Sequence, residues 1–407
     1  MKLYERKSYP GILVLLLSLL GFSFPAGVTQ FSMVAGDLAG EMGVPVQTVL
    51  IADSLRAVCL VSAMFLSGYV YKRLGMRRTI ILGVLFQVVS QFSVPAAVSL
   101  RSLPLLFIFK GMQGLNALAF PLYISVITQW VDRRYCGLAT AVFNGSFTAG
   151  AGIGAWAVGR LVPVSGWRAS FYLIGGICLL FALPVLLTVR ENPARSGCTV
   201  RLQKKKNVYG TIIRNPATWL LVVMLVANTW VAQAVTVDMS VFAQHLGYSY
   251  EQTGTLMLLI SVVTVVSSIL GGWVSDFFAA RSENSVRTRS LILAAGYVLS
   301  AAAAAVLSSA AVRSIYALTL AACAMMSGVS WSAGVFWALP SEIYSAEDNV
   351  AGTAFCSGAS NIPNPIAPAV VGVLLGTHGY WTAGWMTCLF VSLLSAAAAA
   401  AVAGRQK

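Results

Sequence analysis

Apolar runs of about 20 residues or more recur along almost the whole 407-residue chain, and they limit what it can fold into. Each run is long enough to cross a bilayer as a helix, and none alternates apolar and polar residues as a barrel strand does. Twelve such spans are predicted, near residues 11–33, 49–71, 79–99, 104–130, 136–159, 169–188, 217–243, 252–276, 290–309, 314–339, 351–375 and 380–403. The sequence therefore predicts an all-α polytopic membrane protein.

The composition excludes several other classes of protein. Hydrophobic residues make up 58% of the chain and charged residues only 10%, which is not typical of a soluble domain. The seven cysteines contain no CxxC pair and indicate neither a disulfide framework nor a metal site. No phosphate-binding Walker A loop and no nucleophile–base arrangement occur, so we expect no ATP-driven pump, no enzyme and no cofactor.

Cationic residues are distributed unevenly between the two sides of the predicted spans. If both termini are cytoplasmic, 21 of the 27 Lys and Arg residues lie on the cytoplasmic side, 4 lie outside and 2 lie within spans. This asymmetry predicts a multi-pass protein of the cell membrane with cytoplasmic N- and C-termini. It also explains the net charge of +14 through the anionic lipids of the inner leaflet, so no nucleic-acid partner is expected.

The longest connector divides the chain into two blocks of six spans. We expect an N-terminal six-helix lobe at 1–189, a basic cytoplasmic linker at 190–214 and a C-terminal six-helix lobe at 215–407.

A weak repeat relates the two blocks. Gly43 and Gly247, which precede spans two and eight, are 204 residues apart, and the strings GLATA and GTAFC, which open spans five and eleven, are 215 apart. The repeat predicts two pseudo-symmetric lobes.

Several motifs resemble those of the major facilitator superfamily. The loop GYVYKRLGMRR at 68–78 resembles the family's G-x-x-x-D-R-x-G-R-R/K-R/K, with Lys72 in place of Asp, and the second lobe keeps that acid as Asp276 in GWVSD. Span four contains KGMQG, which is similar to the family's R-x-x-Q-G with Lys110 in place of Arg. The strings FNGS, GWRASF and ENP are similar to the organic-anion symporter branch, although span one lacks the Asp–Arg pair common there and span four lacks an acid after KGMQG.

The resemblance implies a monomeric secondary transporter that works by alternating access. We expect it to move a small organic anion, a carboxylate or a sugar acid, in symport with a proton. The alternative is a proton-driven efflux transporter for drugs or other amphipathic compounds, which the absence of a proline in the glycine-rich stretch of span five disfavours.

Charges inside a membrane span are costly and therefore mark candidate functional residues. Lys110 is the candidate fixed charge that attracts the anion, with Gln113 one turn further on the same helix face; the alternative is a lysine that snorkels to the interface. The substrate-binding candidates are Lys110, Gln113, Asn116, Gln30, Asn144, Gln233, Trp331 and Asn361. Amides in spans also serve as contacts between helices, which is the alternative for each of them.

Three further charged residues in spans are candidates for proton coupling, namely Asp53, Arg56 and Asp238. The i,i+3 spacing of Asp53 and Arg56 also allows them to neutralise each other. In span eleven, the prolines of NIPNPIAP at 361–368 predict a break that would lie against protein or a wet cavity.

A second group of charges is predicted to form a cytoplasmic gate. Its members are Lys72, Arg73, Arg77, Arg78, Arg133, Arg134, Asp276, Glu347 and Asp348. We expect Lys72 and Arg73 to pair with Glu347 or Asp348, and Asp276 to pair with Arg133 or Arg134. The alternative is that these cations only fix the orientation of the spans.

Overall fold

The computed structural model describes residues 8–131, 133–189, 212–309, 312, 314–336, 339–344, 349–378 and 381–405. Every regular element in these ranges is a helix. Contacts divide the chain into a first unit of Met1–Arg201 with Ala243–Leu258 and a second unit of Leu202–Phe242 with Leu259–Lys407. The segment Ala243–Leu258 thus groups with the first unit, although it follows the linker in the sequence.

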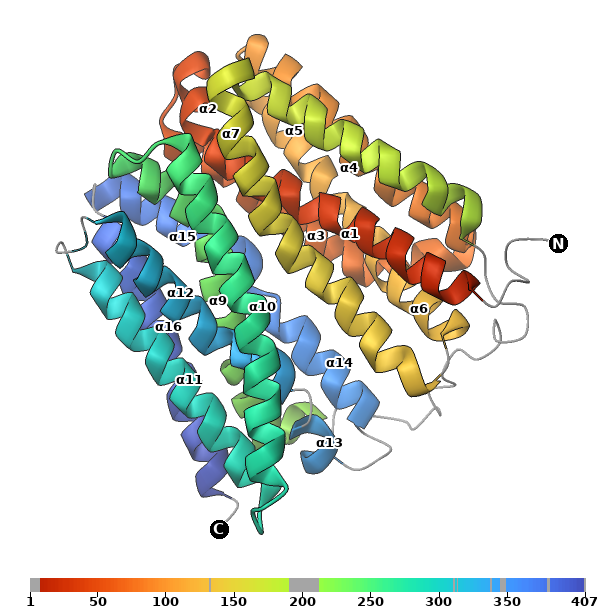
Figure 1. Ribbon diagram of the computed structural model, residues 1–407, viewed down its shortest axis with the longest axis vertical. Helices are drawn as coiled ribbons and strands as arrows, with labels where there is room; N and C mark the ends of the chain where they lie inside the picture. The colour runs from red at the N-terminus through yellow and green to blue at the C-terminus, as the bar shows by residue number, and fades with distance from the viewer. Residues whose placement is uncertain are drawn as a thin grey trace. The chain divides into compact units, whose positions relative to one another are not determined.

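The first unit contains the helices of the N-terminal half, with α1 lying along α7 (Figure 1). These helices are α1 (Tyr9–Met33), α2 (Ala35–Met42), α3 (Val46–Leu74), α4 (Met76–Ser99), α5 (Leu103–Gly114), the 3-10 turn η2 (Leu115–Leu118), α6 (Phe120–Trp130) and α7 (Arg133–Thr188).

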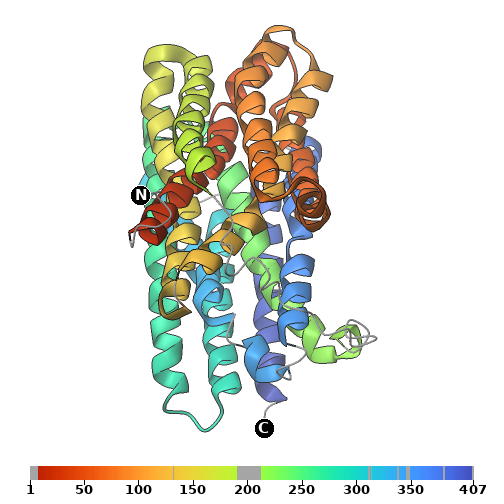
Figure 2. The same cartoon turned by 90° about the vertical axis from the view of Figure 1, so that its right-hand side faces the viewer.

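The second unit contains most of the remaining helices. They are α9 (Pro216–His245), α10 (Tyr250–Ala279), α11 (Ser285–Ser308), α12 (Ile315–Val335), α13 (Leu339–Ile343), α14 (Asn349–Ser360), α15 (Pro363–His378) and α16 (Trp381–Gly404). The helices α10 and α11 run side by side and are joined by a short turn (Figure 2).

Ten helical segments of the described chain are long and apolar enough to cross a membrane. One of them, within α7, contains two helices that meet at Gly166, whose φ of 76° is not helical. The broken pair α14 and α15 supplies a further segment, and the break at 361–362 lies where the prolines of span eleven predicted it. The architecture agrees with the predicted fold of twelve transmembrane helices.

Glycines in the left-handed region end several of these helices. Gly75, with φ 77°, ends α3 inside the basic loop, and Gly43 and Gly247 have φ values of 69° and 89°. An L-residue with a side chain rarely adopts this region, so glycine is favoured at each turn. Gly43 and Gly247 are the pair predicted from the 204-residue repeat, and both have a positive φ.

Span four is not the continuous helix that the sequence predicted. The helix α5 ends at Gly114, η2 follows, and α6 begins at Phe120 with Pro121 in its first turn. Proline has no amide hydrogen to donate and is tolerated in a first turn, so the chain restarts its helix there. The 3-10 turn therefore separates Lys110 and Gln113 on α5 from the rest of the span.

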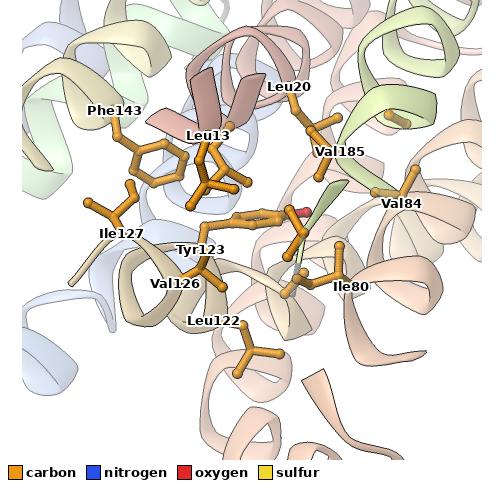
Figure 3. Packing of buried hydrophobic residues seen from close by; sticks show 14 of the residues in the cluster. Leu13, Leu20, Ile80, Val84, Leu122, Tyr123, Val126, Ile127, Phe143 and Val185 are labelled. Carbon is orange, nitrogen blue, oxygen red and sulfur yellow. The ribbon is translucent and has the colours of Figure 1, made fainter. Parts of the chain in front are cut away.

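A hydrophobic cluster fills the first unit between α1, α4, α6 and α7. Figure 3 shows Leu13 of α1 close to Tyr123 of α6 and Phe143 of α7, and Leu20 of α1 beside Val185 of α7. Each of these side chains is almost fully buried. The polar residues of the candidate site lie on other faces of α1, α3, α4 and α5.

Candidate functional site

Three charged side chains meet inside the first unit and form what we call the ion cluster: Asp53, Arg56 and Lys110. Arg56 donates to Asp53 through two parallel bonds, Nε to Oδ1 at 2.6 Å and Nη2 to Oδ2 at 2.7 Å. Lys110 Nζ lies 3.3 Å from the same Asp53 Oδ1. The exposed fractions of the three residues are only 1%, 5% and 1%. The i,i+3 pairing that the sequence predicted is present, and a cation from another helix has joined it.

Lys110 has two further contacts. Its ammonium donates to Gln113 Oε1 at 2.5 Å and lies 3.9 Å from the centroid of the Phe31 ring. The first contact follows from the i,i+3 spacing on α5, and the second is a cation–π contact with α1. Lys110 is therefore held inside the bundle and does not snorkel to the interface.

Small residues allow α5 to approach α3 this closely. A methyl group at Gly114 would lie 2.0 Å from the carbonyl oxygen of Arg56 and 2.9 Å from Cys59 Cβ, and one at Gly111 would lie 3.4 Å from Cys59 Sγ. The string KGMQG thus places its two polar side chains toward the charges and uses its glycines for close packing.

The ion cluster has two cations and one anion. Burying a charge is expensive unless it is paired, and Asp53 already accepts from both cations, so one positive charge remains in excess. In a low-dielectric interior this excess charge attracts an anion far more strongly than it would in water. The arrangement is chemically suited to binding a carboxylate or another oxyanion.

The other substrate-binding candidates of the first unit lie in different environments. Gln30 is fully buried and donates through Nε2 to Ser170 Oγ at 3.0 Å, and Asn116 donates to Gln87 Oε1 at 2.8 Å. Asn144 lies on the exposed side of α7. The structure thus brings Lys110, Gln113 and both coupling candidates of the first unit together, and Asn144 is not among them.

The candidates of the second unit are separated from one another. Trp331 donates from Nε1 to Ser267 Oγ at 3.0 Å, and a methyl group at Gly271 would lie 2.8 Å from its ring, so it packs α12 against α10. Asp238 is buried beside Trp385, and Asn361 accepts from Asn364 at 2.9 Å at the break between α14 and α15.

Gln233 is half-buried on α9, and its Nε2 has no hydrogen-bond partner in the described part of the chain.

The predicted gate residues are only partly described. Lys72, Arg73, Arg77 and Arg78 are all exposed at the turn between α3 and α4, with the Arg73 guanidinium 4.9 Å from the centroid of the Tyr69 ring. Glu347 and Asp348, and the side chains of Arg133 and Arg134, lie outside the described residues.

Asp276 has a partner that the sequence did not predict. Its Oδ1 accepts from Arg289 Nη1 at 2.8 Å, and Arg289 Nε lies 3.3 Å from Glu342 Oε1. Arg289 lies about one turn into α11, and Asp276 lies in the last turn of α10. The ion pair therefore forms between consecutive helices of the second unit. The pairing of Asp276 with Arg133 or Arg134 stays a prediction, because the side chains of these two arginines lie outside the described residues.

Sequence reasoning also missed two buried glutamines, Gln87 and Gln91, whose exposed fractions are 0% and 1%. They lie one turn apart on α4, and their side chains reach Gly27 of α1. The signal was present in the sequence, because two glutamines at i,i+4 in an apolar span share one helix face. Among the described residues, no group of three or more His, Cys, Asp and Glu side chains could hold a metal ion.

Known transporters resemble this chain in sequence. An uncharacterized transporter of Bacillus subtilis is 23% identical over 71% of each chain. The sodium-dependent phosphate transport protein 1 of Arabidopsis thaliana is 21% identical over 59% of this chain and 52% of its own length, and the human vesicular glutamate transporter 2 is 23% identical over 56% and 43%. The aligned region therefore spans about half the length of the plant and mammalian relatives.

Solved structures share the fold. A D-xylose-proton symporter superposes with a TM-score of 0.73 and 16% identity over 98% of this chain and 97% of its own. A bacterial homolog of the lysosomal transporter Spinster, in an inward-facing and occupied conformation, also has a TM-score of 0.73, with 15% identity over 99% and 98%.

The sequence profile of the Major Facilitator Superfamily matches residues 13–308, nearly three quarters of the chain. This match confirms the family resemblance found in the motifs. It also confirms the prediction that the chain is a transporter and not an enzyme. Together with the all-helical fold, it means that the chain is a multi-pass membrane transporter that belongs to the Major Facilitator Superfamily.

Proposed function

We propose that this transporter moves a small organic anion, a carboxylate or a sugar acid, across the cell membrane by alternating access and in symport with protons. The observation that carries the proposal is the ion cluster, in which the buried charges of Arg56 and Lys110 exceed that of Asp53 by one. This excess positive charge would not attract a neutral substrate and would repel a cation, whereas a bound anion would neutralise it.

The names of several relatives support an anionic substrate. They describe transport of phosphate, glutamate and ascorbate, and two are named anion transporters. These solutes differ in size and shape but share a negative charge. The charge is also the property that the ion cluster would recognise.

Proton coupling follows from competition for the same cation. Asp53 accepts from Lys110 and Arg56, so a bound anion must compete with the Asp53 carboxylate for them. A proton on Asp53 removes that competition and leaves both cations to the anion, so proton and anion are taken up together. When the proton leaves, the carboxylate reclaims Lys110 and the anion is released.

A proton suits this cluster better than a sodium ion does. Sodium is bound by several oxygen ligands and would lie close to the buried Lys110 ammonium and Arg56 guanidinium, which repel it. A proton needs only one carboxylate oxygen of Asp53. We therefore expect coupling to protons, even though one relative is named as sodium-dependent.

The test is uptake of radiolabelled solutes into proteoliposomes. A panel of sugar acids, mono- and dicarboxylates and inorganic phosphate is compared with neutral sugars and a lipophilic cation, under an inward proton gradient or an inward sodium gradient. We expect one class of anion to accumulate with the proton gradient, and Lys110→Gln to abolish this uptake. Lys110→Arg, which keeps the charge, should retain part of it.

The matched control is Arg101→Gln, which removes a cation from the exposed turn between α4 and α5. It should transport like the wild type. Accumulation of the lipophilic cation or a neutral sugar alone would contradict the proposal, and export of the cation against a proton gradient would favour the efflux alternative. An unchanged Lys110→Gln variant would show that the ion cluster does not bind substrate.

We also propose that both termini lie in the cytoplasm. Single cysteines at Arg101 and Lys72, introduced into a variant without its own cysteines, are exposed to a membrane-impermeant thiol reagent. Arg101→Cys should react in intact cells, and Lys72→Cys only after the cells are permeabilised. The reverse pattern would mean the opposite orientation.

A further inference from the structure

Three glutamine side chains converge on one point of α1. A methyl group at Gly27 would lie 2.1 Å from Nε2 of Gln91, 3.0 Å from Nε2 of Gln113 and 3.1 Å from Nε2 of Gln87. We call these three side chains the amide cluster. A methyl group at this position would therefore displace the Gln91 amide.

The amide cluster is continuous with the ion cluster through Gln113. An amide presents its oxygen on one side and its nitrogen on the other. Since the Gln113 oxygen accepts from Lys110 at 2.5 Å, its nitrogen faces Gly27 and the other two glutamines. The Gln113 amide thus contacts the Lys110 ammonium through its oxygen and faces the other two glutamines through its nitrogen.

The orientation of Gln87 is set from its other side. Asn116 donates to Gln87 Oε1 at 2.8 Å, which turns the Gln87 nitrogen toward Gly27. Within the described residues, Gln87 Nε2 and Gln91 Oε1 are buried without a hydrogen-bond partner. A bundle gains no stability from such groups, so their presence points to a role other than packing.

We propose that Gln91 and Gln87, packed over Gly27, are positioning residues that hold the Gln113 carbonyl toward Lys110 and so set where the Lys110 ammonium meets the transported anion. This inference rests on the proposed function, and it assigns the residues that position the Lys110 charge. Gln91 is expected to contribute most, because its amide nitrogen lies closest to Gly27, where the three amides converge.

The first experiment removes the amide of Gln91 and keeps its length, in Gln91→Met. The apparent KM for the anion should rise about tenfold, which corresponds to the net contribution of one hydrogen bond to a charged group. The maximal rate should stay within about twofold, since the coupling carboxylate is untouched. Gln129→Met is the matched control, because Gln129 lies on α6 and donates to Ser125 Oγ of the same helix.

A second variant, Gln91→Glu, tests whether residue 91 lies close enough to the ion cluster to affect anion binding. At pH 8 the new carboxylate cancels the excess positive charge, so the KM relative to wild type should exceed that of Gln91→Met. At pH 5.5 protonation restores a neutral side chain, and the relative KM should fall. If Gln91 only fills space, Gln91→Met, which keeps its size, should keep the wild-type KM at both pH values, and this result would overturn the proposal.

A structural measurement decides the proposal even if the proposed function fails. Cryo-electron microscopy of Gln91→Met and of Gly27→Ala should show the distance from Lys110 Nζ to Gln113 Oε1 lengthened beyond about 3.5 Å. Gly21→Ala, on the same helix as Gly27, is the steric control. Its new methyl group would lie 2.8 Å from the Phe147 ring of α7. If the distance stays near 2.5 Å in both variants, positioning is overturned, whether or not any anion is transported.

Discussion

The two halves of the chain repeat the same helices but place charge differently. By the 204-residue offset of the repeat, Met257 is equivalent to Asp53 and Ile260 to Arg56. By the 215-residue offset of the later spans, Met325 is equivalent to Lys110. All three counterparts are apolar and buried, with exposed fractions of 3% or less. The ion cluster is therefore not needed to build this helical arrangement, because the other half builds it with methionine and isoleucine.

The second half also buries one acid, Asp238, but the ion pairs described for that half lie near its surface. Asp276 and Glu342 share Arg289, and the exposed fractions of these three side chains are 72%, 26% and 14%. Exposed pairs are solvated in both the folded and the unfolded state, whereas buried ones must be compensated inside the protein. The buried charges of the ion cluster therefore cost stability that apolar residues would not, which is expected of a functional site.

The largest expected effect tests that cost directly. Asp53→Asn leaves Arg56 and Lys110 buried next to each other without a counter-ion, which should lower the free energy of unfolding by about 3–5 kcal/mol. Thermal and denaturant unfolding in detergent micelles measures this. A loss below about 1 kcal/mol, the range of exposed pairs, would mean that water reaches the ion cluster.

The next prediction makes the first half resemble the second. The triple variant Asp53→Met, Arg56→Ile, Lys110→Met replaces the ion cluster with the residues at the equivalent positions. Replacing a buried ion group with apolar side chains is often neutral or stabilising by about 1–4 kcal/mol, so the variant should fold and unfold no more easily than wild type. It should transport no anion. Uptake equal to wild type would remove the ion cluster from the mechanism.

A smaller effect concerns a buried polar group that carries no charge. The hydroxyl of Tyr123 lies in the hydrophobic cluster of Figure 3 and has no hydrogen-bond partner within the described residues. Tyr123→Phe should therefore raise the free energy of unfolding by about 1 kcal/mol, by removing an unsatisfied polar group. Unlike the triple variant, it should leave anion uptake unchanged. A destabilised Tyr123→Phe would indicate that the hydroxyl is solvated in the folded protein.

The smallest effect is expected at the surface of the second half. Asp276→Asn removes one partner of Arg289, while Glu342 remains within 3.3 Å of it. The free energy of unfolding should change by about 0–1 kcal/mol, as for exposed pairs in general. The same unfolding assay checks this beside Asp53→Asn. A loss as large as that of Asp53→Asn would break the comparison between buried and exposed ions.

Local sequence was sufficient for much of the architecture. Apolar runs predicted the spans to within a few residues, the prolines at 361–368 predicted the break between α14 and α15, and the repeat predicted that Gly43 and Gly247 would match. Spacing along one helix also predicted the contact of Lys110 with Gln113 and that of Asp53 with Arg56. These features depend on residues that are close in sequence, which is why a single chain reveals them.

Contacts between helices were predicted poorly. Nothing in the sequence indicated that Lys110 of α5 would reach Asp53 of α3, that Asp276 would pair with Arg289, or that Gln91 would cover Gly27. Each depends on the rotation of one helix against another. That rotation is decided by many packing contacts, among them the close approach at Gly114, and not by any short motif.

By itself, the sequence determined which segments enter the membrane and the family to which the chain belongs. Insertion depends on hydropathy summed over about 20 neighbouring residues, and this sum can be read from the chain directly. Two features depend on the tertiary structure alone. One carboxylate is shared by two cations, and three amides converge next to one of these cations, Lys110. Such a site needs atoms from several helices placed within about 3 Å of one another, and only the packed bundle fixes positions so closely.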